Sequence, residues 1–310
     1  MRKNVRILMM LTAMVAVLML SSLSAFAAEG VDWGNSTITV TGSGIAPANA
    51  HNAAQARMLA RRAAVVDGYR QLAEAVKGVN VDSETTVQNM MVVSDTTKTK
   101  VSAFIQGAKI VSEKVIPDGG YEVTMTVSMF GVSNSLASAV MPKPAAVEAF
   151  PQPVATVAPS VPASVHVDVT VTTQPTVPTP APTTPVAPQA SSASAAPTGK
   201  AIGGYTGLIV DCSGLGLKPV MSPVIKNASG QPIYGDKNLD YDRVVSNGMA
   251  AYTVDIHNAV RAGSNPLVVR AVSLDNHNGN PILSVADANR VLIENGASGF
   301  LDRTAVVFVR

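Results

Sequence analysis

The 310-residue sequence has one cysteine, Cys212, and few aromatic residues: one tryptophan, six tyrosines and six phenylalanines. A single cysteine cannot form an intramolecular disulfide, so no domain of this chain is held by such a cross-link. Carbohydrate sites usually present an exposed aromatic side chain, and the shortage of aromatics counts against that class of ligand. Without a disulfide, each domain must depend on its hydrophobic core for stability.

Histidine is also scarce, and no metal-ligand spacing is present. The four histidines are scattered without an H-x-x-x-H pair: His51, His166, His257 and His277. Three aspartates cluster after Gly235, at positions 236, 240 and 242, but they lack the ordered oxygens, central glycine and closing glutamate of a calcium loop. We expect a solvated loop there and no metal.

Three motifs that resemble reactive sites have simpler explanations. Asp211-Cys212-Ser213 follows a predicted strand, but a nucleophilic cysteine needs a neighbouring base, and an unpaired cysteine is more often a small buried residue. Gly42-Ser43-Gly44 and Gly214-Leu215-Gly216 lack the third glycine and helix start of a nucleotide fingerprint, so we expect tight turns. The sequence therefore predicts no enzyme and no cofactor.

The N-terminus has the pattern of a Sec signal peptide. A basic start, Met1-Arg2-Lys3, is followed by an apolar run at Ile7–Leu20, and Ala25 and Ala27 flank a small-x-small cleavage site. The run is shorter than the roughly 20 residues of a transmembrane helix. We expect cleavage after Ala27, export by the Sec route, no transmembrane segment afterwards, and a location in the periplasm or outer cell envelope.

Removal of the signal changes the charge balance. Three of the 23 basic residues leave, and the remaining 20 face 21 acidic residues. A net charge near zero gives no electrostatic reason to expect nucleic acid or an anionic membrane as partner.

The first module, residues 28–141, is organised around a predicted amphipathic helix at Asn49–Gly78 that follows a strand at Thr37–Thr41. We expect Asn49 as N-cap and Gly78 as a left-handed C-cap. The predicted apolar face includes Met58, Val65, Val66, Tyr69, Leu72 and Val76, and the alanines allow close approach to a sheet. The charged outer face, our candidate interaction surface, carries Arg61, Asp67, Arg70 and Glu74.

Further along, Val87–Val93 is predicted as a strand or an irregular packed segment, and a short helix starts at Ser94 or Asp95. A hairpin then joins Lys109–Ile116 to Tyr121–Phe130 through Pro117-Asp118-Gly119-Gly120. Alternation in its second strand predicts one core face and one solvent face.

This series of a strand, Gly42-Ser43-Gly44, an alanine-rich helix and Gly78-Val79-Asn80-Val81, followed by Gly107 and the hairpin, resembles the 20-kilodalton envelope lipoprotein family. It also resembles the N-terminal domain of flagellar assembly protein T. The chain departs from the lipoprotein pattern because no lipobox cysteine is present. The resemblance implies a non-catalytic α+β module of the bacterial envelope, sometimes associated with flagellar basal structures.

Residues 142–199 contain 13 of the 20 prolines and only three fully charged side chains. This composition is typical of a long disordered linker. Extended at roughly 3.1 Å per residue, such a linker would separate two domains by more than about 100 Å. Within it, Val165–Val171 alternates as a strand would, although a valine-rich disordered tract is at least as compatible with the pattern.

The second module, residues 200–310, is predicted as a separate α+β domain. Its expected elements are a buried strand at Gly207–Asp211, a hairpin across Val220–Tyr234, a helical region within Val244–Ala262, a strand at Leu267–Leu274, a helix capped by Ser284, and a last strand at Thr304–Val309. Thr206–Pro219 and Asn265–Ala271 resemble a C-terminal module of exported bacterial proteins.

The predicted fold is therefore α+β: a signal peptide and two small domains, each a sheet packed with helices, joined by a long disordered proline-rich linker. We expect an exported non-enzymatic envelope protein that acts through protein interaction, with flagellar or surface-structure assembly proteins as the partner class. The alternative is a binding module for peptidoglycan or a surface polysaccharide, with the cell wall as partner.

Overall fold

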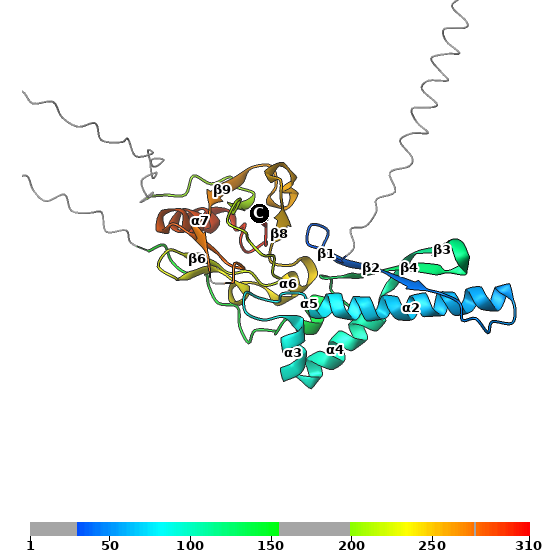
Figure 1. The fold of residues 1–310 in the computed structure, drawn as a ribbon. Coiled ribbons are helices and arrows are strands. Elements are labelled where there is room, and N and C mark those ends of the chain that lie inside the picture. Colours follow the sequence, from blue (N-terminus) through cyan, green and yellow to red (C-terminus); the bar gives the residue numbers. More distant parts are fainter. Residues whose placement is uncertain (1–29, 155–198, 276) are drawn as a thin grey trace, which may run out of the picture. The chain divides into compact units, whose positions relative to one another are not determined.

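The computed structural model describes residues 30–154 and 199–310, except Asn276 (Figure 1). The described chain forms two compact units, each with strands and helices. The prediction of an α+β protein with two domains is thereby confirmed. The predicted signal peptide and the island Val165–Val171 lie outside the described residues.

The units do not follow the order of the sequence. The first unit contains the described residues up to Pro144 and also takes in Pro219–Ser222 and Tyr241–Tyr252. The second unit contains the described residues within Ala145–Lys218, together with Pro223–Asp240 and Thr253–Arg310. Two short segments of the predicted C-terminal module therefore complete the first unit.

The first unit is built on an antiparallel sheet in the order β1-β2-β4-β3. These strands are β1 (Gly30–Asp32), β2 (Thr37–Gly44), β3 (Lys109–Val115) and β4 (Tyr121–Ser128). The predicted hairpin between β3 and β4 is confirmed, with a short 3-10 turn at Pro117–Gly119. One face of the sheet supplies the core, through Ile38, Val40, Val123, Met125 and Val127.

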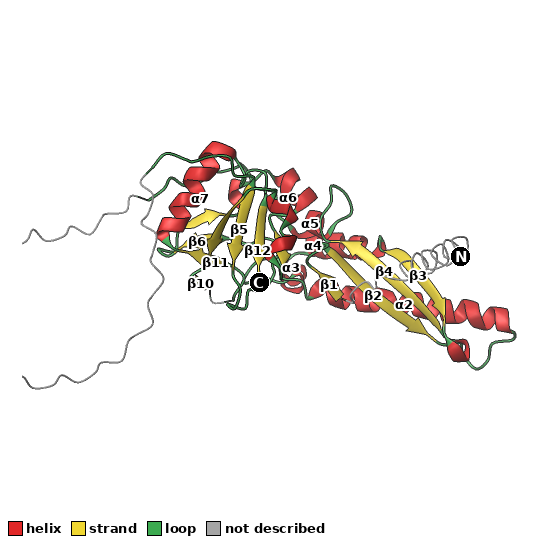
Figure 2. Ribbon diagram, turned by 90° about the horizontal axis from the view of Figure 1, so that it is seen from above, coloured by secondary structure: helices red, strands yellow, loops and turns green. Residues whose placement is uncertain are grey.

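Helix α2 (Ala53–Lys77) packs along this sheet, as Figure 2 shows. Its N-cap is Asn52, whose side chain accepts a hydrogen bond from the Gln55 backbone N–H at 2.8 Å, so the prediction of Asn49 was wrong. Gly78 does end the helix, but with φ −77°, and not in the predicted left-handed conformation.

The buried stripe of α2 differs from the predicted apolar face. It repeats every four residues: Ala60, Ala64, Gly68, Leu72 and Val76. Met58 and Val66 were predicted on or beside that face but are 68% and 69% exposed. The N-terminal half of the helix contacts the sheet through small side chains, and its larger ones point elsewhere.

Close packing against β2 explains this choice of residues. A Cβ atom on Gly42 would lie 2.2 Å from the Gly68 backbone nitrogen, and one on Gly44 would lie 2.3 Å from the Ala60 carbonyl oxygen. The glycines of Gly42-Ser43-Gly44 therefore permit a helix to contact a strand, and the predicted tight turn is wrong because they lie within β2.

Three shorter helices, α3, α4 and α5, follow α2 among the described residues up to Pro144. Residues 87–93 form α3 (Val87–Val93), and not a strand or an irregular segment, because Thr86 caps the helix by accepting a hydrogen bond from the Asn89 N–H at 3.3 Å. Helix α4 (Asp95–Gln106) is capped by Ser94 and ends at Gly107, as predicted. The short α5 (Leu136–Val140) is mostly buried.

Segments from beyond residue 218 pair with the first unit. The Met221 N–H donates to the Asn80 carbonyl at 3.0 Å, and the Ser222 N–H donates to the Val81 carbonyl at 2.7 Å. Tyr252 contacts the only tryptophan, Trp33, edge to face at 5.6 Å between ring centroids. These contacts make the late segments part of the core of this unit.

Helix α6 (Tyr241–Asn247) is one of these segments. It ends before Gly248, which has φ +74° and lies so close to Phe130 that a Cβ atom would be 2.9 Å from the ring. The predicted helical region to Ala262 therefore stops early, because a left-handed glycine terminates it. Strand β8 (Ala251–Thr253) and two single 3-10 turns follow.

The second unit contains parallel strands, two of which are buried on both faces. Strand β5 (Gly207–Asp211) pairs in parallel with β9 (Pro266–Arg270) and β12 (Val306–Val309). The continuous apolar sequences of β5 and β12 are typical of such strands. A second sheet has the order β10-β11-β6-β7. Its strands are β6 (Ile225–Asn227), β7 (Pro232–Tyr234), β10 (Ser273–Leu274) and β11 (Pro281–Leu283).

Helix α7 (Val285–Ser298) is capped by Ser284 as predicted, and it ends at Gly299 in the left-handed conformation. Its buried face also holds the chain on both sides of residues 155–198. Asn289 exchanges hydrogen bonds with the Val154 backbone at 2.7 and 2.8 Å, and Glu294 accepts from the Ile202 and Gly203 N–H groups at 3.0 and 2.9 Å.

The described chain on each side of residues 155–198 is thus hydrogen-bonded to one helix, α7. Asn289 and Glu294 are separated by five residues, or about 7.5 Å along the helix axis. Within the described residues, no helix is both long enough and apolar enough to cross a membrane.

Candidate interaction surface

Of the four predicted surface residues of α2, Arg61 makes contacts separate from those of the other three. Its guanidinium forms a two-pronged ion pair with Glu113 of β3, with Nε to Oε2 at 2.8 Å, and the Tyr121 hydroxyl lies 2.8 Å from the same carboxylate. Hydrogen bonds from Arg61 and then Tyr121 lower the pKa of Glu113 to about 2. Arg61 therefore connects α2 to β3.

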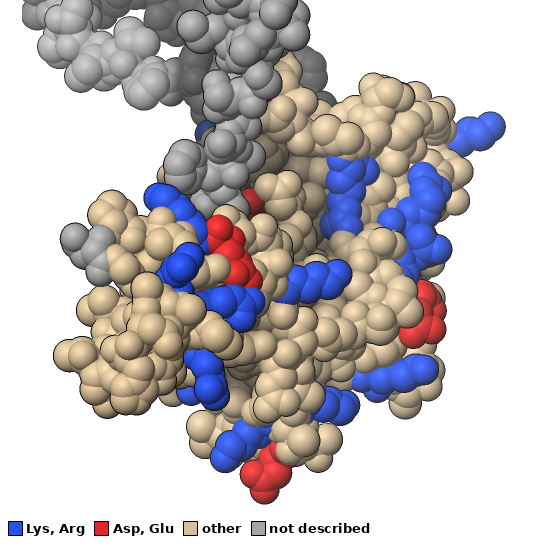
Figure 3. Space-filling model, turned by 90° about the vertical axis from the view of Figure 1, so that its right-hand side faces the viewer, with Lys and Arg blue, Asp and Glu red and all other residues tan. Residues whose placement is uncertain are grey.

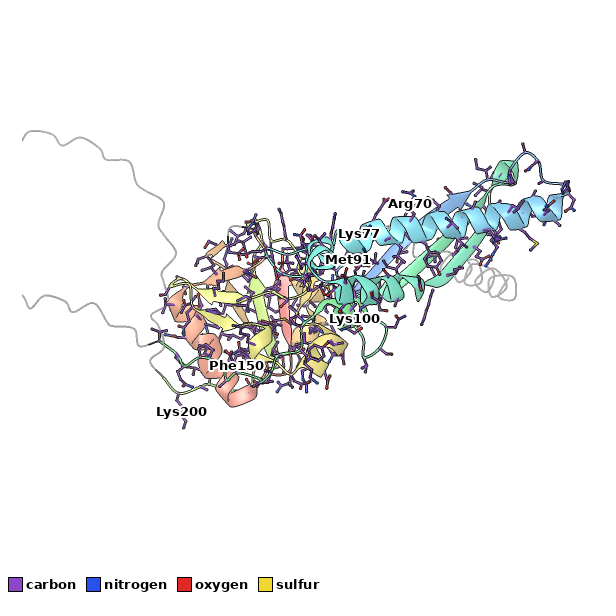
Figure 4. The ribbon with its side chains drawn as sticks, turned by 90° about the horizontal axis from the view of Figure 1, so that it is seen from below. Arg70, Lys77, Met91, Lys100, Phe150 and Lys200 are labelled. Carbon is purple, nitrogen blue, oxygen red and sulfur yellow. The ribbon has the colours of Figure 1, made fainter. Side chains whose placement is uncertain are left out.

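Asp67, Arg70 and Glu74 form one group. Asp67 accepts from the Ser43 backbone N–H at 3.0 Å and pairs with Arg70 at 2.8 Å, and these bonds, Ser43 first, lower the pKa of the Asp67 carboxyl. Arg70 also pairs with Glu74 at 2.9 Å. Only Arg70 and Glu74 have largely exposed side chains, at 61% and 63%, and Figure 4 shows Arg70 on the outer side of the helix.

Strand β3 lies at one end of the sheet order, and every one of its residues is exposed. The exposed side chains include Ile110, Val111 and Val115, at 39%, 57% and 53%. The pairing with β4 shifts between Ile110 and Ser112, so Val111 is a bulged residue. An exposed edge presents backbone N–H and C=O groups on its outer side, where another strand can pair.

The N-terminal half of α2 also carries exposed apolar and basic side chains. Met58 and Val66 are exposed, and the arginines Arg57 and Arg62 lie on the same half of the helix, which has no acidic residue before Asp67. Figure 3 faces this end of the unit and shows Lys and Arg side chains at many points, with Asp and Glu at few. We call β3 and the exposed part of α2 up to Val66 the edge surface.

Sequence reasoning pointed to α2 but missed the part that β3 plays. A signal was present: Lys109–Val115 does not alternate and places lysine and glutamate among valines, a composition typical of an edge strand. The pairing of Arg61 with Glu113 spans 52 residues of sequence and had no local signature.

Cys212 lies in the second unit, where it is fully buried at the end of β5. Burial, and then the charge of Asp211, raises the pKa of the thiol to about 12. His257 and His277 are exposed. The thiol therefore remains protonated at neutral pH, which argues against its use as a nucleophile.

The remaining candidate motifs also have structural roles. Gly214 and Gly216 have φ of +79° and +76°, in a turn as predicted. Asp236 begins a single 3-10 turn, and Asp242 lies in the first turn of α6. Across residues 30–154 and 199–310, no group of three or more histidine, cysteine, aspartate or glutamate residues is arranged to hold a metal ion.

Comparison with known families gives two matches, one in each half of the chain. The LPP20 lipoprotein family matches residues 37–128, which run from β2 to β4. The family of the second domain of Treponema pallidum Tp0624 matches residues 207–310, which run from β5 to the end of β12. No curated protein matches the chain. The polypeptide is thus similar to the LPP20 lipoprotein family over residues 37–128 and to the second domain of Tp0624 over residues 207–310.

Proposed function

We propose that this is an exported, non-enzymatic protein of the bacterial cell envelope that acts by binding other proteins. The match of residues 37–128 to the LPP20 lipoprotein family supports an envelope location. The protonated, buried state of Cys212 and the structural roles of the glycine motifs support a function without catalysis.

The edge surface is the proposed binding site for the partner. The observation that carries this assignment is the exposure of the whole of β3 at the sheet edge, where Arg61 of α2 pairs with Glu113 of the strand. A partner strand that pairs with β3 would gain backbone hydrogen bonds and cover three exposed apolar side chains. Assembly proteins of the flagellum or another surface structure are the proposed partner class, from the sequence resemblance.

Site-specific crosslinking tests this proposal. A photoreactive amino acid replaces Val111 on β3, or Val254, which is 74% exposed in the second unit, and cells are irradiated before envelope fractionation. We expect a discrete crosslinked species from position 111 that disappears when Val115→Lys places a charge on the strand. Equal amounts of crosslinked product from both positions, or no product from position 111, would contradict the proposal.

A further inference from the structure

Residues Glu148–Val154, which we call the strap, lie extended on the second unit. At its start, the Glu148 N–H donates to the Lys237 carbonyl at 2.8 Å. The Asn238 side-chain amide donates to the carbonyls of Glu148 and Ala149 at 3.3 and 3.2 Å. These bonds reach only the backbone of the strap, so they fit any extended peptide at this position.

One aromatic side chain anchors the strap. The ring of Phe150 stacks parallel to Tyr234, with centroids 6.4 Å apart and an interplanar angle of 2°. Tyr234 is fully buried and belongs to β7, so it forms the rigid floor of the contact. Figure 4 shows Phe150 beside α7.

At its other end, the strap is held by a buried amide. Asn289 of α7 is 5% exposed; its Oδ1 accepts from the Val154 N–H at 2.8 Å, and its Nδ2 donates to the Val154 carbonyl at 2.7 Å. A buried amide without hydrogen-bond partners is destabilising, so the position opposite Asn289 favours a peptide backbone that offers both an N–H and a carbonyl.

The strap does not fill the groove that it crosses. A cavity of about 780 Å³ lies between Phe150–Pro153 and the C-terminal half of α7. Its walls include Leu292, Ile293 and Ser298 of the helix, and Asp302 beyond the helix. The groove is therefore wide enough for a ligand bulkier than the strap.

From these contacts we propose that the groove is a binding site for extended, proline-containing peptides, and that the strap occupies it in cis. The ligand carries an aromatic residue four positions before the residue that Asn289 holds, as Phe150 precedes Val154. A tethered segment has an effective concentration of about millimolar, so a partner's peptide must displace the strap. This site is separate from the edge surface and does not depend on it.

The test uses a fluorescent peptide with the sequence of residues 148–154, EAFPQPV, and the full chain. In the release variant, Phe150→Ala removes the anchor and Val154→Pro removes the N–H that Asn289 binds. By fluorescence anisotropy we expect the release variant to bind the peptide at least about tenfold more tightly than the unaltered chain, because the strap no longer competes.

Two controls identify the groove. Adding Asn289→Ala to the release variant should abolish the gain, whereas adding Val254→Ala, at an exposed position elsewhere in the unit, should leave it unchanged. A peptide with alanine for its phenylalanine should bind no variant. Circular dichroism verifies that each variant is folded.

A folded release variant that binds the peptide no better than the unaltered chain would show the strap to be purely structural. Binding that is insensitive to Asn289→Ala would overturn the groove assignment. Retention of the release variant on purified cell wall without peptide binding would also overturn it, because the ligand would then be a glycan.

Discussion

At the scale of single residues, polar side chains of this protein work mainly by joining distant segments. Arg61 and Glu113 connect a helix to an edge strand, Asp67 connects α2 to the Ser43 backbone, and Asn289 connects α7 to Val154. In the sequence, nothing distinguishes Glu113 and Asp67 from ordinary surface charges. Their effects on stability are therefore open to measurement one substitution at a time.

The Arg61–Glu113 pair predicts a specific pH dependence. The pKa of Glu113 falls from the ordinary 4.5 to about 2 in the folded protein, so the pair stabilises the fold fully above pH 4.5 and loses this effect as pH falls toward 2. In thermal unfolding, Glu113→Gln should lower the Tm at pH 7 and match the unaltered protein near pH 2. Glu74→Gln, at a largely exposed pair, should have a smaller effect at pH 7.

Cys212 should be inert in the folded protein. Its burial and its pKa of about 12 keep the thiol protonated and inaccessible. A thiol-reactive dye at pH 7 should label it only after denaturant is added. Rapid stoichiometric labelling of the native chain would contradict the buried position.

Gly44 cannot carry a side chain without a clash, because α2 packs closely against β2 at this position. Gly44→Ala would place a Cβ atom 2.3 Å from the Ala60 carbonyl oxygen, and we expect a loss of about 1–3 kcal/mol or more in the free energy of unfolding. Gly78→Ala is the matched control, since its Cβ atom would meet its nearest neighbour at an ordinary 3.6 Å and φ is −77°. Denaturant titration of the two variants measures the difference in their free energies of unfolding.

At the scale of elements, α2 shows how packing overrides a hydrophobic pattern. The helix has larger apolar residues available, yet it buries Ala60, Ala64 and Gly68 against the sheet and leaves Met58 and Val66 in solvent. Helical periodicity locates an apolar face only when the residues of that face are larger than their neighbours. Here, close contact selected the smallest side chains.

A pair of substitutions on α2 tests this orientation. Leu72→Asp buries a charge in a fully buried position and should cost at least the roughly 2–5 kcal/mol of a Leu→Ala change in a core. Val66→Asp, at 69% exposure on the same helix, should leave the Tm nearly unchanged. Equal effects in thermal denaturation would show that the buried face is misassigned.

At the scale of the whole molecule, the two family matches do not correspond to two self-contained pieces. The first unit takes Pro219–Ser222 and Tyr241–Tyr252 from the region that matches the Tp0624 family. Residues 145–154, which have the composition of a linker, bind the second unit through the strap. The edge surface and the groove therefore depend on an assembled chain.

This interdependence predicts the behaviour of a truncated chain. A fragment ending at Pro144 lacks Tyr252, which packs on Trp33, and Gly248, which follows α6 and lies close to Phe130. We expect this fragment to unfold at lower denaturant concentration than the full chain, with red-shifted emission from Trp33. Tyr252→Ala in the full chain should reproduce part of the red shift, and unchanged emission in the fragment would contradict the shared core.

Local chemistry in the sequence determined several elements of the fold. Ser94 and Ser284 predicted their helix starts because their side chains satisfy free N–H groups within a few residues. The β3–β4 hairpin followed from alternation and a proline-glycine turn, and the buried strand β5 from its continuous apolar run. Each of these signals acts within about ten residues of chain.

The tertiary structure alone decided which distant segments meet. Val154 and Ile202 bind one helix, Met221 pairs with Asn80, and Glu113 pairs with Arg61, although sequence separations from 52 to 141 residues carry no pattern that marks such partners. The physical reason is that these contacts depend on burial and geometry created only when the chain is folded. The edge surface and the strap groove belong to this second class.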